Sequence, residues 1–335
     1  MHLHLLVPDL LSPGADIRID AGETLLARGR HQSAPSHSTE SWLCEQYGLE
    51  DAAAGSAFCL LGDGRQPADA CWLRADPVHL RIDRDELVLA DSTAFAITDA
   101  EARALTDSFN AHFAPALQLD PVHPERWYAQ LDSAPETHWT PLAEARGKPI
   151  SRHLPKGDAA MRWHALMNEA QMLLHEHPVN EAREARGELP LNSIWFWGGG
   201  KRADLPGRPF ERVFANDPLA RGLAAASGAA AAPLPASATD WLRTAPESGN
   251  VLLLLDALRA PFAYGELSEW ATRVAALERD WLLPLLAALR DGRIGMLTTH
   301  CLSADGSIAV ETTRMDLRRF WRRRKPLASY VMATV

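Results

Sequence analysis

The chain has 335 residues, of which 47% are hydrophobic and 23% are charged, so it can form one large domain or two ordinary ones with a sizeable core. Its net charge of −9 makes nucleic acid and anionic membranes poor default partners. The longest apolar run, Val251 to Leu255, is far shorter than the roughly 20 residues that span a bilayer.

The N-terminus and the cysteines both favour the cytoplasm. Met1 to Asp9 has no basic segment and no small-residue cleavage site, so it is interpreted as a first strand rather than a signal peptide. The four cysteines form no CxxC pair, which favours reduced, partly buried thiols over a disulfide framework. We therefore expect a soluble cytoplasmic protein.

The first predicted element is a buried strand over Leu3 to Val7. It ends at Pro8-Asp9 and would deliver Asp9 to the carboxyl edge of a sheet, where open α/β proteins bind their ligands. The elements expected next are helix 22–29, polar loop 30–39, helix 41–47, strands 70–73, 78–82 and 86–89, helix 100–113, and loops with one or two strands over 114–158. Strands grouped before a helix indicate a small α+β unit.

The second half alternates predicted strands and helices, which is the pattern of a mainly parallel sheet. The expected elements are helix 158–177, strand 192–197, helix 218–226, an Ala/Pro loop over 229–235, strand 251–255, helix 268–290, strand 295–299 and a basic helix over 315–325.

A glycine turn is predicted directly after the strand over 192–197. Gly198, Gly199 and Gly200 have no side-chain bulk, so their backbone N–H groups would be open to an anion, and Lys201 and Arg202 add positive charge. The alternative is a tight connection without a ligand. The turn matches neither a dinucleotide fingerprint nor a phosphate-binding P-loop, so the alternative has the greater weight.

Two further segments have a structural and a functional interpretation. Ser38 precedes a helix, where it would act as an N-cap, the favoured interpretation, or as a nucleophile at a helix N-terminus. The segment Arg318 to Lys325 holds six basic residues in eight, with two aromatic residues between them. It would contact phosphates and stack on bases, or form a solvated face, and the acidic character of the whole chain disfavours nucleic acid.

The stretch from His177 to Gly200 carries the most specific pattern. It reads His-Pro-Val-Asn-Glu-x-Arg-x3-Gly-x2-Pro-x-Asn-x2-Trp-x-Trp-Gly-x-Gly, and it resembles a signature of cofactor-independent phosphoglycerate mutases of the archaeal type, in the alkaline phosphatase superfamily. Fainter similarity covers most of the chain. It places Ser38 at the position of the family's nucleophilic serine and Arg74 near a family arginine.

The resemblance implies an alkaline-phosphatase-like α/β core with a mainly parallel sheet flanked by helices, and an inserted α+β subdomain. We expect the core over 1–55 and 160–335 and the insertion over 56–159. A second resemblance is to a bacterial group of regulatory proteins of the pathogenicity-factor E type, which implies regulation and no established chemistry.

The metal ligands that the family resemblance implies are only partly present. Family enzymes use two divalent metals, held by Asp and His, to activate the serine, and two nearby cations require a full set of ligands. Asp9 is retained, but the segment after the Val251 strand offers only Asp256. The family's Asp-His pair reads His300-Cys301 here, and its last histidine falls among arginines and Phe320.

The leading hypothesis is a degenerate, non-catalytic mutase-like protein that binds a small anionic or phosphorylated ligand, or a protein partner, in a regulatory role, with no cofactor. The ligand-binding residues expected are Arg183, Asn192, Gly198, Gly199, Gly200, Lys201 and Arg202. The alternative is an active phosphomutase or phosphatase with Ser38 as nucleophile. Its Mn, Zn or Mg would be bound by Asp9, Asp256 and His300.

Overall fold

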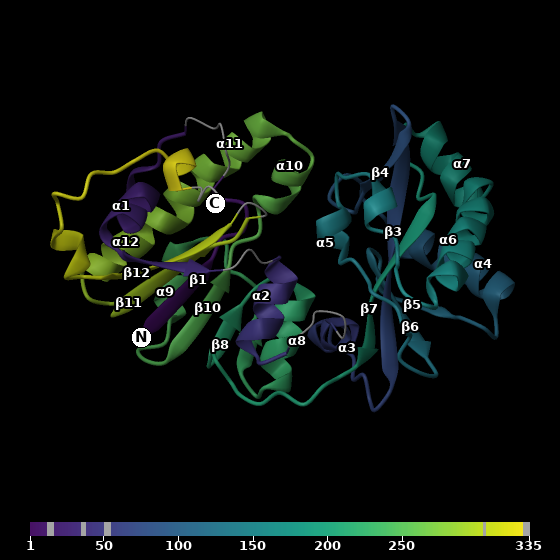
Figure 1. The fold of residues 1–335 in the computed structure, drawn as a ribbon, viewed down its shortest axis with the longest axis horizontal. Helices are drawn as coiled ribbons and strands as arrows, with labels where there is room; N and C mark the ends of the chain where they lie inside the picture. Colours follow the sequence, from purple (N-terminus) through teal and green to yellow (C-terminus); the bar gives the residue numbers. More distant parts are fainter. Residues whose placement is uncertain (12–16, 35–37, 50–54, 304–305, 331–335) are drawn as a thin grey trace. The chain divides into compact units, whose positions relative to one another are not determined.

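The computed structural model describes residues 1–11, 17–34, 38–49, 55–303 and 306–330. The chain divides into two compact units (Figure 1). One is formed by Met1–Leu49 and Leu205–Val335, and we call it the split unit. The other is formed by Glu50–Asp204, and we call it the inserted unit.

The split unit contains a seven-stranded sheet with the strand order β2-β12-β11-β1-β10-β8-β9. Its strands are β1 (His2–Leu6), β2 (Arg30–Ala34), β8 (Arg212–Phe214), β9 (Ala230–Ala232), β10 (Asn250–Leu254), β11 (Met296–Cys301) and β12 (Ser307–Thr313). All pairings from β11 through β9 are parallel, whereas β12 and β2 pair in the antiparallel direction. The predicted mainly parallel sheet is therefore confirmed.

Helices cover both faces of this sheet (Figure 1). They are α1 (Asp20–Arg28), α2 (Thr39–Gln46), α8 (Pro218–Ala226), α9 (Ala238–Thr244), α10 (Arg259–Ala263), α11 (Leu267–Leu277), the π-helical segment η3 (Glu278–Leu282), α12 (Leu283–Arg290) and the 3-10 turns η4 (Asp316–Arg318) and η5 (Leu327–Tyr330). Leu3 and Leu5 of β1 are fully buried in one core with side chains of α1, α9, α11 and α12. The alternate residues His2 and His4 point to the opposite face, because successive side chains of a strand alternate.

The inserted unit is an antiparallel α+β structure built around one long strand. Its strands are β3 (Cys71–Asp83), β4 (Glu86–Ala90), β5 (Leu119–His123), β6 (Arg126–Leu131) and β7 (Ser193–Lys201). Its helices are α3 (Gly55–Gly62), α4 (Asp99–Phe113), α5 (Leu142–Ala145), the 3-10 turn η2 (Ile150–Arg152), α6 (Ala160–His175) and α7 (Pro178–Ala185). Because β3 pairs with β4, β6 and β7, it holds this sheet together.

The boundary of the inserted unit differs from the expected one. The sequence pattern assigned 160–335 to the core, but residues up to Asp204 belong to the inserted unit. The reason is β7, which pairs with β3 from Ser193↔Val78 to Lys201↔Cys71. Helix α6 also belongs to this unit, because it packs against β7: the ring centres of Trp163 in α6 and Phe196 in β7 are 5.6 Å apart.

Some predicted secondary structures were wrong. The Ala/Pro stretch expected as a loop over 229–235 contains strand β9 (Ala230–Ala232). The polar segment expected as a loop forms β2, an edge strand that pairs with β12. The expected basic helix over 315–325 is limited to the three residues of η4. Like charges three and four residues apart, such as Arg318 and Arg322, repel each other on a helix. Within the described residues, no helix is long and apolar enough to cross a membrane.

Candidate functional site

Carboxylates gather at the carboxyl edge of the parallel strands in the split unit. Asp9 follows β1, Asp256 follows β10, and Asp217 follows β8. The carboxyl ends of parallel strands meet at one edge of the sheet, and Asp217 interacts electrostatically with Asp256 there. We call Asp9, Glu40, Asp217, Asp256 and Arg259 the acidic edge.

The guanidinium of Arg259 lies among these carboxylates. Its Nη2 donates to both carboxylate oxygens of Glu40, at 3.0 and 3.1 Å. The two side chains are only 14% and 7% exposed. Burial opposes the charge of Arg259, but Glu40, Asp217 and Asp9 outweigh this and raise its pKa. Arg259 is therefore a permanent internal cation of the acidic edge.

Asp217 carries a carboxyl group that does not ionise easily. Its Oδ1 accepts a hydrogen bond from the backbone N–H of Ala220 at 2.8 Å and so caps α8. Burial, followed by repulsion from the Glu40 carboxylate, raises the pKa of Asp217 to about 6, although Arg259 opposes this rise. The single guanidinium therefore does not fully compensate the negative charge of the acidic edge.

Replacement of Asp217 by asparagine is expected to stabilise the protein at neutral pH. The folded chain holds the Asp217 proton up to about pH 6, while the unfolded chain loses it near 3.8, so stability falls as the pH rises through this window. Asparagine caps a helix equally well and stays neutral. We expect a gain of up to about 3 kcal/mol at pH 7 in urea denaturation, shrinking towards pH 4.

The exposed Asp291 gives the matched control. Asp291→Asn, a surface substitution, should change the free energy of unfolding at pH 7 by less than about 0.5 kcal/mol. An Asp217→Asn variant whose stability relative to the natural chain is the same at pH 4 and pH 7 would contradict the prediction.

The residues of the acidic edge do not fit a two-metal centre. Among the residues that the structure describes, no group of three or more His, Cys, Asp or Glu is arranged to hold a metal ion. The expected ligands Asp9 and Asp256 are accompanied by the positive charge of Arg259, which disfavours a divalent cation.

The third expected ligand, His300, engages histidine and aromatic side chains. Its Nε2 lies 3.1 Å from Nδ1 of His4, and its ring packs 4.8 Å from the ring of Trp42. Burial, with a contribution from neighbouring histidines, lowers the pKa of His4 to about 3 and that of His300 to about 4. Both rings are therefore neutral at pH 7, and their hydrogen bond needs no counter-ion.

Ser38 stands at the N-terminus of α2. Its Oγ accepts a hydrogen bond from the backbone N–H of Ser41 at 3.1 Å and donates one to the Ser41 hydroxyl at 2.9 Å. The N-cap interpretation of Ser38 is confirmed. Its role as a nucleophile stays a prediction.

Two of the expected ligand-binding side chains in the inserted unit are bound to the chain itself. Arg183 is 1% exposed, and it donates to the carbonyls of Leu189 and Ala96 at 2.8 and 3.0 Å. Asn192 exchanges two hydrogen bonds with the backbone of Leu80, at 2.7 and 2.9 Å. These groups stabilise the loops and strand ends of the fold.

The three glycines lie inside strand β7 and do not form the predicted turn. The pairing of β7 with β3 shifts register between Trp72 and Arg74, so Gly198 and Gly199 lie in a bulge. Gly198 has φ +72°, and a Cβ there would lie 2.6 Å from Oγ of Ser56 in α3. Gly198 therefore allows α3 to approach the strand closely.

Gly198→Ala is expected to lower the free energy of unfolding by about 2 kcal/mol or more. The left-handed backbone costs about 1–2 kcal/mol for a residue with a Cβ. The new Cβ also displaces the Ser56 hydroxyl, which donates to the Trp197 carbonyl at 3.0 Å and accepts from the Arg74 N–H at 2.8 Å. Urea denaturation measures the change.

Gly64 separates these two effects. It also has a positive φ, +86°, but a Cβ there would meet nothing within 4 Å. Gly64→Ala should therefore show the backbone cost alone. Equal losses in the two variants would mean that close packing against Ser56 contributes nothing.

The two basic residues after the glycines face solvent. Lys201 forms an exposed ion pair with Asp69 at 3.1 Å, and Arg202 is exposed. Exposed pairs of this kind contribute little to stability. Lys201 and Arg202 are therefore the expected ligand contacts that remain accessible.

A buried ion pair fixes β3 to β7 near these glycines. Arg74 donates from Nε and Nη2 to Oδ1 of Asp76, at 3.0 and 2.5 Å, and the indole N–H of Trp197 donates to Oδ2 of Asp76 at 2.5 Å. The Arg74 guanidinium also lies 5.1 Å from the ring centres of both Tyr128 and Trp197. Both charges are balanced inside the unit, so the pair acts as a structural element.

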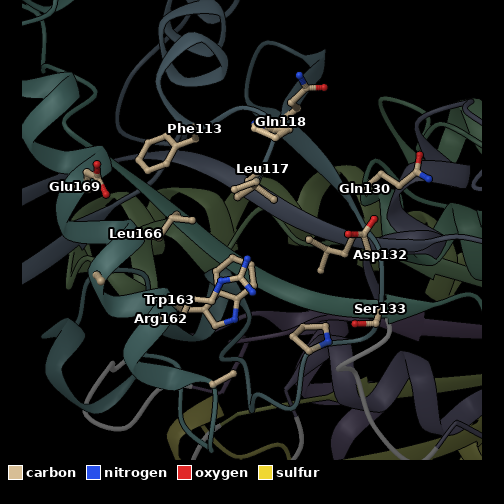
Figure 2. A pocket seen from close by; sticks show the side chains of 16 residues that line it. Phe113, Leu117, Gln118, Gln130, Asp132, Ser133, Arg162, Trp163, Leu166 and Glu169 are labelled. Atoms are coloured by element: carbon tan, nitrogen blue, oxygen red, sulfur yellow. The ribbon is translucent and has the colours of Figure 1, made fainter.

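The inserted unit also has a cavity of about 660 Å³ between the end of α4, the end of β6 and helix α6 (Figure 2). Phe113, Leu117, Trp163 and Leu166 supply apolar surface, and Arg162 is among its polar side chains. None of the site residues expected from the sequence lines this cavity.

Comparisons of sequence and of structure both find similarity to phosphoglycerate mutases. The model of the family 2,3-bisphosphoglycerate-independent phosphoglycerate mutase matches residues 66–180. The enzyme of that name from Methanothrix thermoacetophila is 35% identical over 119 residues, which are 36% of this chain and 30% of the relative. A probable enzyme of that name from Geobacter sulfurreducens is 31% identical over 153 residues, 41% of this chain and 38% of the relative.

The likeness to this family in the family model is limited to residues 66–180. The solved structure of the cofactor-independent phosphoglycerate mutase from Thermoplasma acidophilum superposes with a TM-score of 0.52 at 16% identity, covering all of this chain and 95% of that one. At this identity the likeness concerns the fold alone, and it confirms the expected alkaline-phosphatase-like α/β class. This chain aligns with only about a third of the length of the two curated relatives.

The family match and the acidic edge lie in different parts of the chain. Residues 66–180 fall within the inserted unit, whereas Asp9, Glu40 and Arg259 belong to the split unit. The family model therefore does not extend over the residues at which metal chemistry was expected.

Proposed function

We propose that this mutase-like chain does not catalyse phosphoglycerate mutation and acts in regulation by binding an anionic ligand or a protein partner. The observation that carries the proposal is the ion pair between Arg259 and Glu40 within the acidic edge. Glu40 holds the guanidinium in the electrostatic range of Asp9, one of the expected ligands, where its fixed positive charge opposes binding of a divalent metal.

Loss of the metal site would leave no activated nucleophile. A serine hydroxyl is a weak nucleophile until a base or a metal activates it. In the described structure Ser38 interacts with Ser41 and caps α2. Exposed Lys201 and Arg202 are the residues that we propose for contact with an anionic ligand.

The experiment measures metal content and activity on the full chain. The purified protein is incubated with Mn²⁺, Zn²⁺ or Mg²⁺, desalted and analysed by plasma mass spectrometry, and it is then assayed with 3-phosphoglycerate and with p-nitrophenyl phosphate. We expect less than stoichiometric metal and no turnover above a heat-treated control.

The alternative function, a metal-dependent phosphomutase or phosphatase, makes the opposite prediction. Two tightly bound Mn or Zn ions per chain, together with turnover that Ser38→Ala abolishes, would overturn the proposal. Ser38→Thr is the matched variant, because threonine retains a capping hydroxyl and separates loss of the cap from loss of the nucleophile.

A further inference from the structure

The basic segment Arg318 to Lys325 contains two aromatic side chains that the fold leaves in solvent. Phe320 is 79% exposed and Trp321 is 66% exposed. Their ring centres are 5.4 Å apart and their planes are inclined by 80°, so most of the apolar surface of the pair is open. Adjacent exposed rings of this size mark interaction sites in soluble proteins.

Three arginines anchor the segment to the split unit. Arg319 forms an ion pair with Asp316 at 2.9 Å, Arg322 donates to the carbonyl of Gly29 at 2.7 Å, and Arg324 is hydrogen-bonded to Asp20. The carbonyl and carboxylate acceptors belong to η4 and to helix α1 with its C-cap. The segment is therefore held in place before any partner binds.

The remaining basic residues are directed to solvent. Arg318, Arg323 and Lys325 are exposed, and within the described part of the chain their side chains form no hydrogen bond or ion pair. Arg318 ends η4, whereas Arg323 and Lys325 lie in residues 323–326, which have no regular secondary structure. The segment is fixed in place and has three exposed basic side chains that can contact phosphates. Its two exposed aromatic rings can stack on bases.

We propose that the segment Arg318 to Lys325 binds single-stranded nucleic acid, with its open cations on phosphates and the rings of Phe320 and Trp321 on bases. The net charge of −9 disfavoured such a partner at the level of the whole chain. The anchored segment is locally basic, in contrast to the net negative charge of the whole chain. Guanidinium groups also match the geometry of phosphate oxygens. The segment contains no residue of the acidic edge, so the two proposals fail independently.

The experiment measures fluorescence anisotropy of labelled dT20 and U20 with the full chain at 20 to 150 mM NaCl. With three phosphate contacts, the logarithm of the association constant should fall against the logarithm of salt concentration with a slope of about −2. Arg323→Gln should reduce the slope to about −1.4. Arg290→Gln, which removes an exposed charge elsewhere on the split unit, should leave it unchanged.

The aromatic residues are tested separately from the charges. Phe320→Ala and Trp321→Ala should each weaken binding about tenfold at one salt concentration while the salt slope is retained. Circular dichroism verifies that these exposed substitutions leave the fold intact. No binding at 20 mM NaCl, binding that none of these variants alters, or binding to phosphatidylserine vesicles but to neither oligonucleotide would overturn the proposal.

Discussion

Replacement of Arg259 by methionine is expected to lower the free energy of unfolding by about 3–5 kcal/mol. The substitution leaves the Glu40 carboxylate, only 7% exposed, without its guanidinium partner. Asp217 lies in the same electrostatic field and loses an attractive charge as well. An uncompensated buried charge costs more than a lost surface interaction, because no water replaces the missing partner.

The double variant Arg259→Met with Glu40→Met tests the cause of this loss. When both charges are removed, stability should recover by at least about half, since replacing a buried pair by apolar groups is often neutral. Arg273→Met is the matched control, because Arg273 forms an exposed pair with Glu269 and should cost less than about 1 kcal/mol. Urea denaturation measures all three. A loss below about 1 kcal/mol in Arg259→Met would contradict burial of the pair.

Arg74→Met is expected to destabilise the inserted unit by a similar amount, about 3–5 kcal/mol. The Asp76 carboxylate is 1% exposed and loses two of the three hydrogen bonds that Arg74 and Trp197 donate to it. The contacts of the guanidinium with the rings of Tyr128 and Trp197 are lost as well. Since Arg74 joins β3 to β6 and β7, hydrogen exchange should accelerate in all three strands.

Two comparisons isolate the buried charge of Asp76. Arg74→Met combined with Asp76→Leu removes both charges and should recover part of the stability. Arg65→Met removes the exposed partner of Asp120 and should cost less than about 1 kcal/mol. If Arg74→Met and Arg65→Met have equal effects in urea denaturation, the buried pair is not a structural element of this unit.

The family-like stretch His177 to Gly200 serves the fold of the inserted unit. Asn180 donates to the carbonyls of Leu174 and Leu191, at 2.7 and 3.0 Å, and closes the connection from α7 to β7. His177 caps α7 and contacts the Ser108 hydroxyl at 2.9 Å. The described contacts of Asn180 and His177 are therefore structural.

The net charge of the chain does not reveal the local positive charge of the segment Arg318 to Lys325. The net charge of −9 describes the whole chain, but Arg318, Arg323 and Lys325 are all exposed within one short segment that also holds two exposed rings. Composition gives the net charge of a protein, whereas binding of a charged partner depends on the charges that lie within about a Debye length of it.

Local apolar periodicity and short-range spacing suffice to predict the parallel sheet, the α+β character of the insertion and the cap at Ser38, because each depends on residues a few positions apart. The bulge at Gly198 and Gly199, and the pairing of Ser193 to Lys201 with β3, emerge only in the tertiary structure. It also placed the guanidinium of Arg259 on Glu40, a residue 219 positions away. Ion pairs and strand pairings at such separations leave no periodic signal, since they arise from the packing of the whole chain.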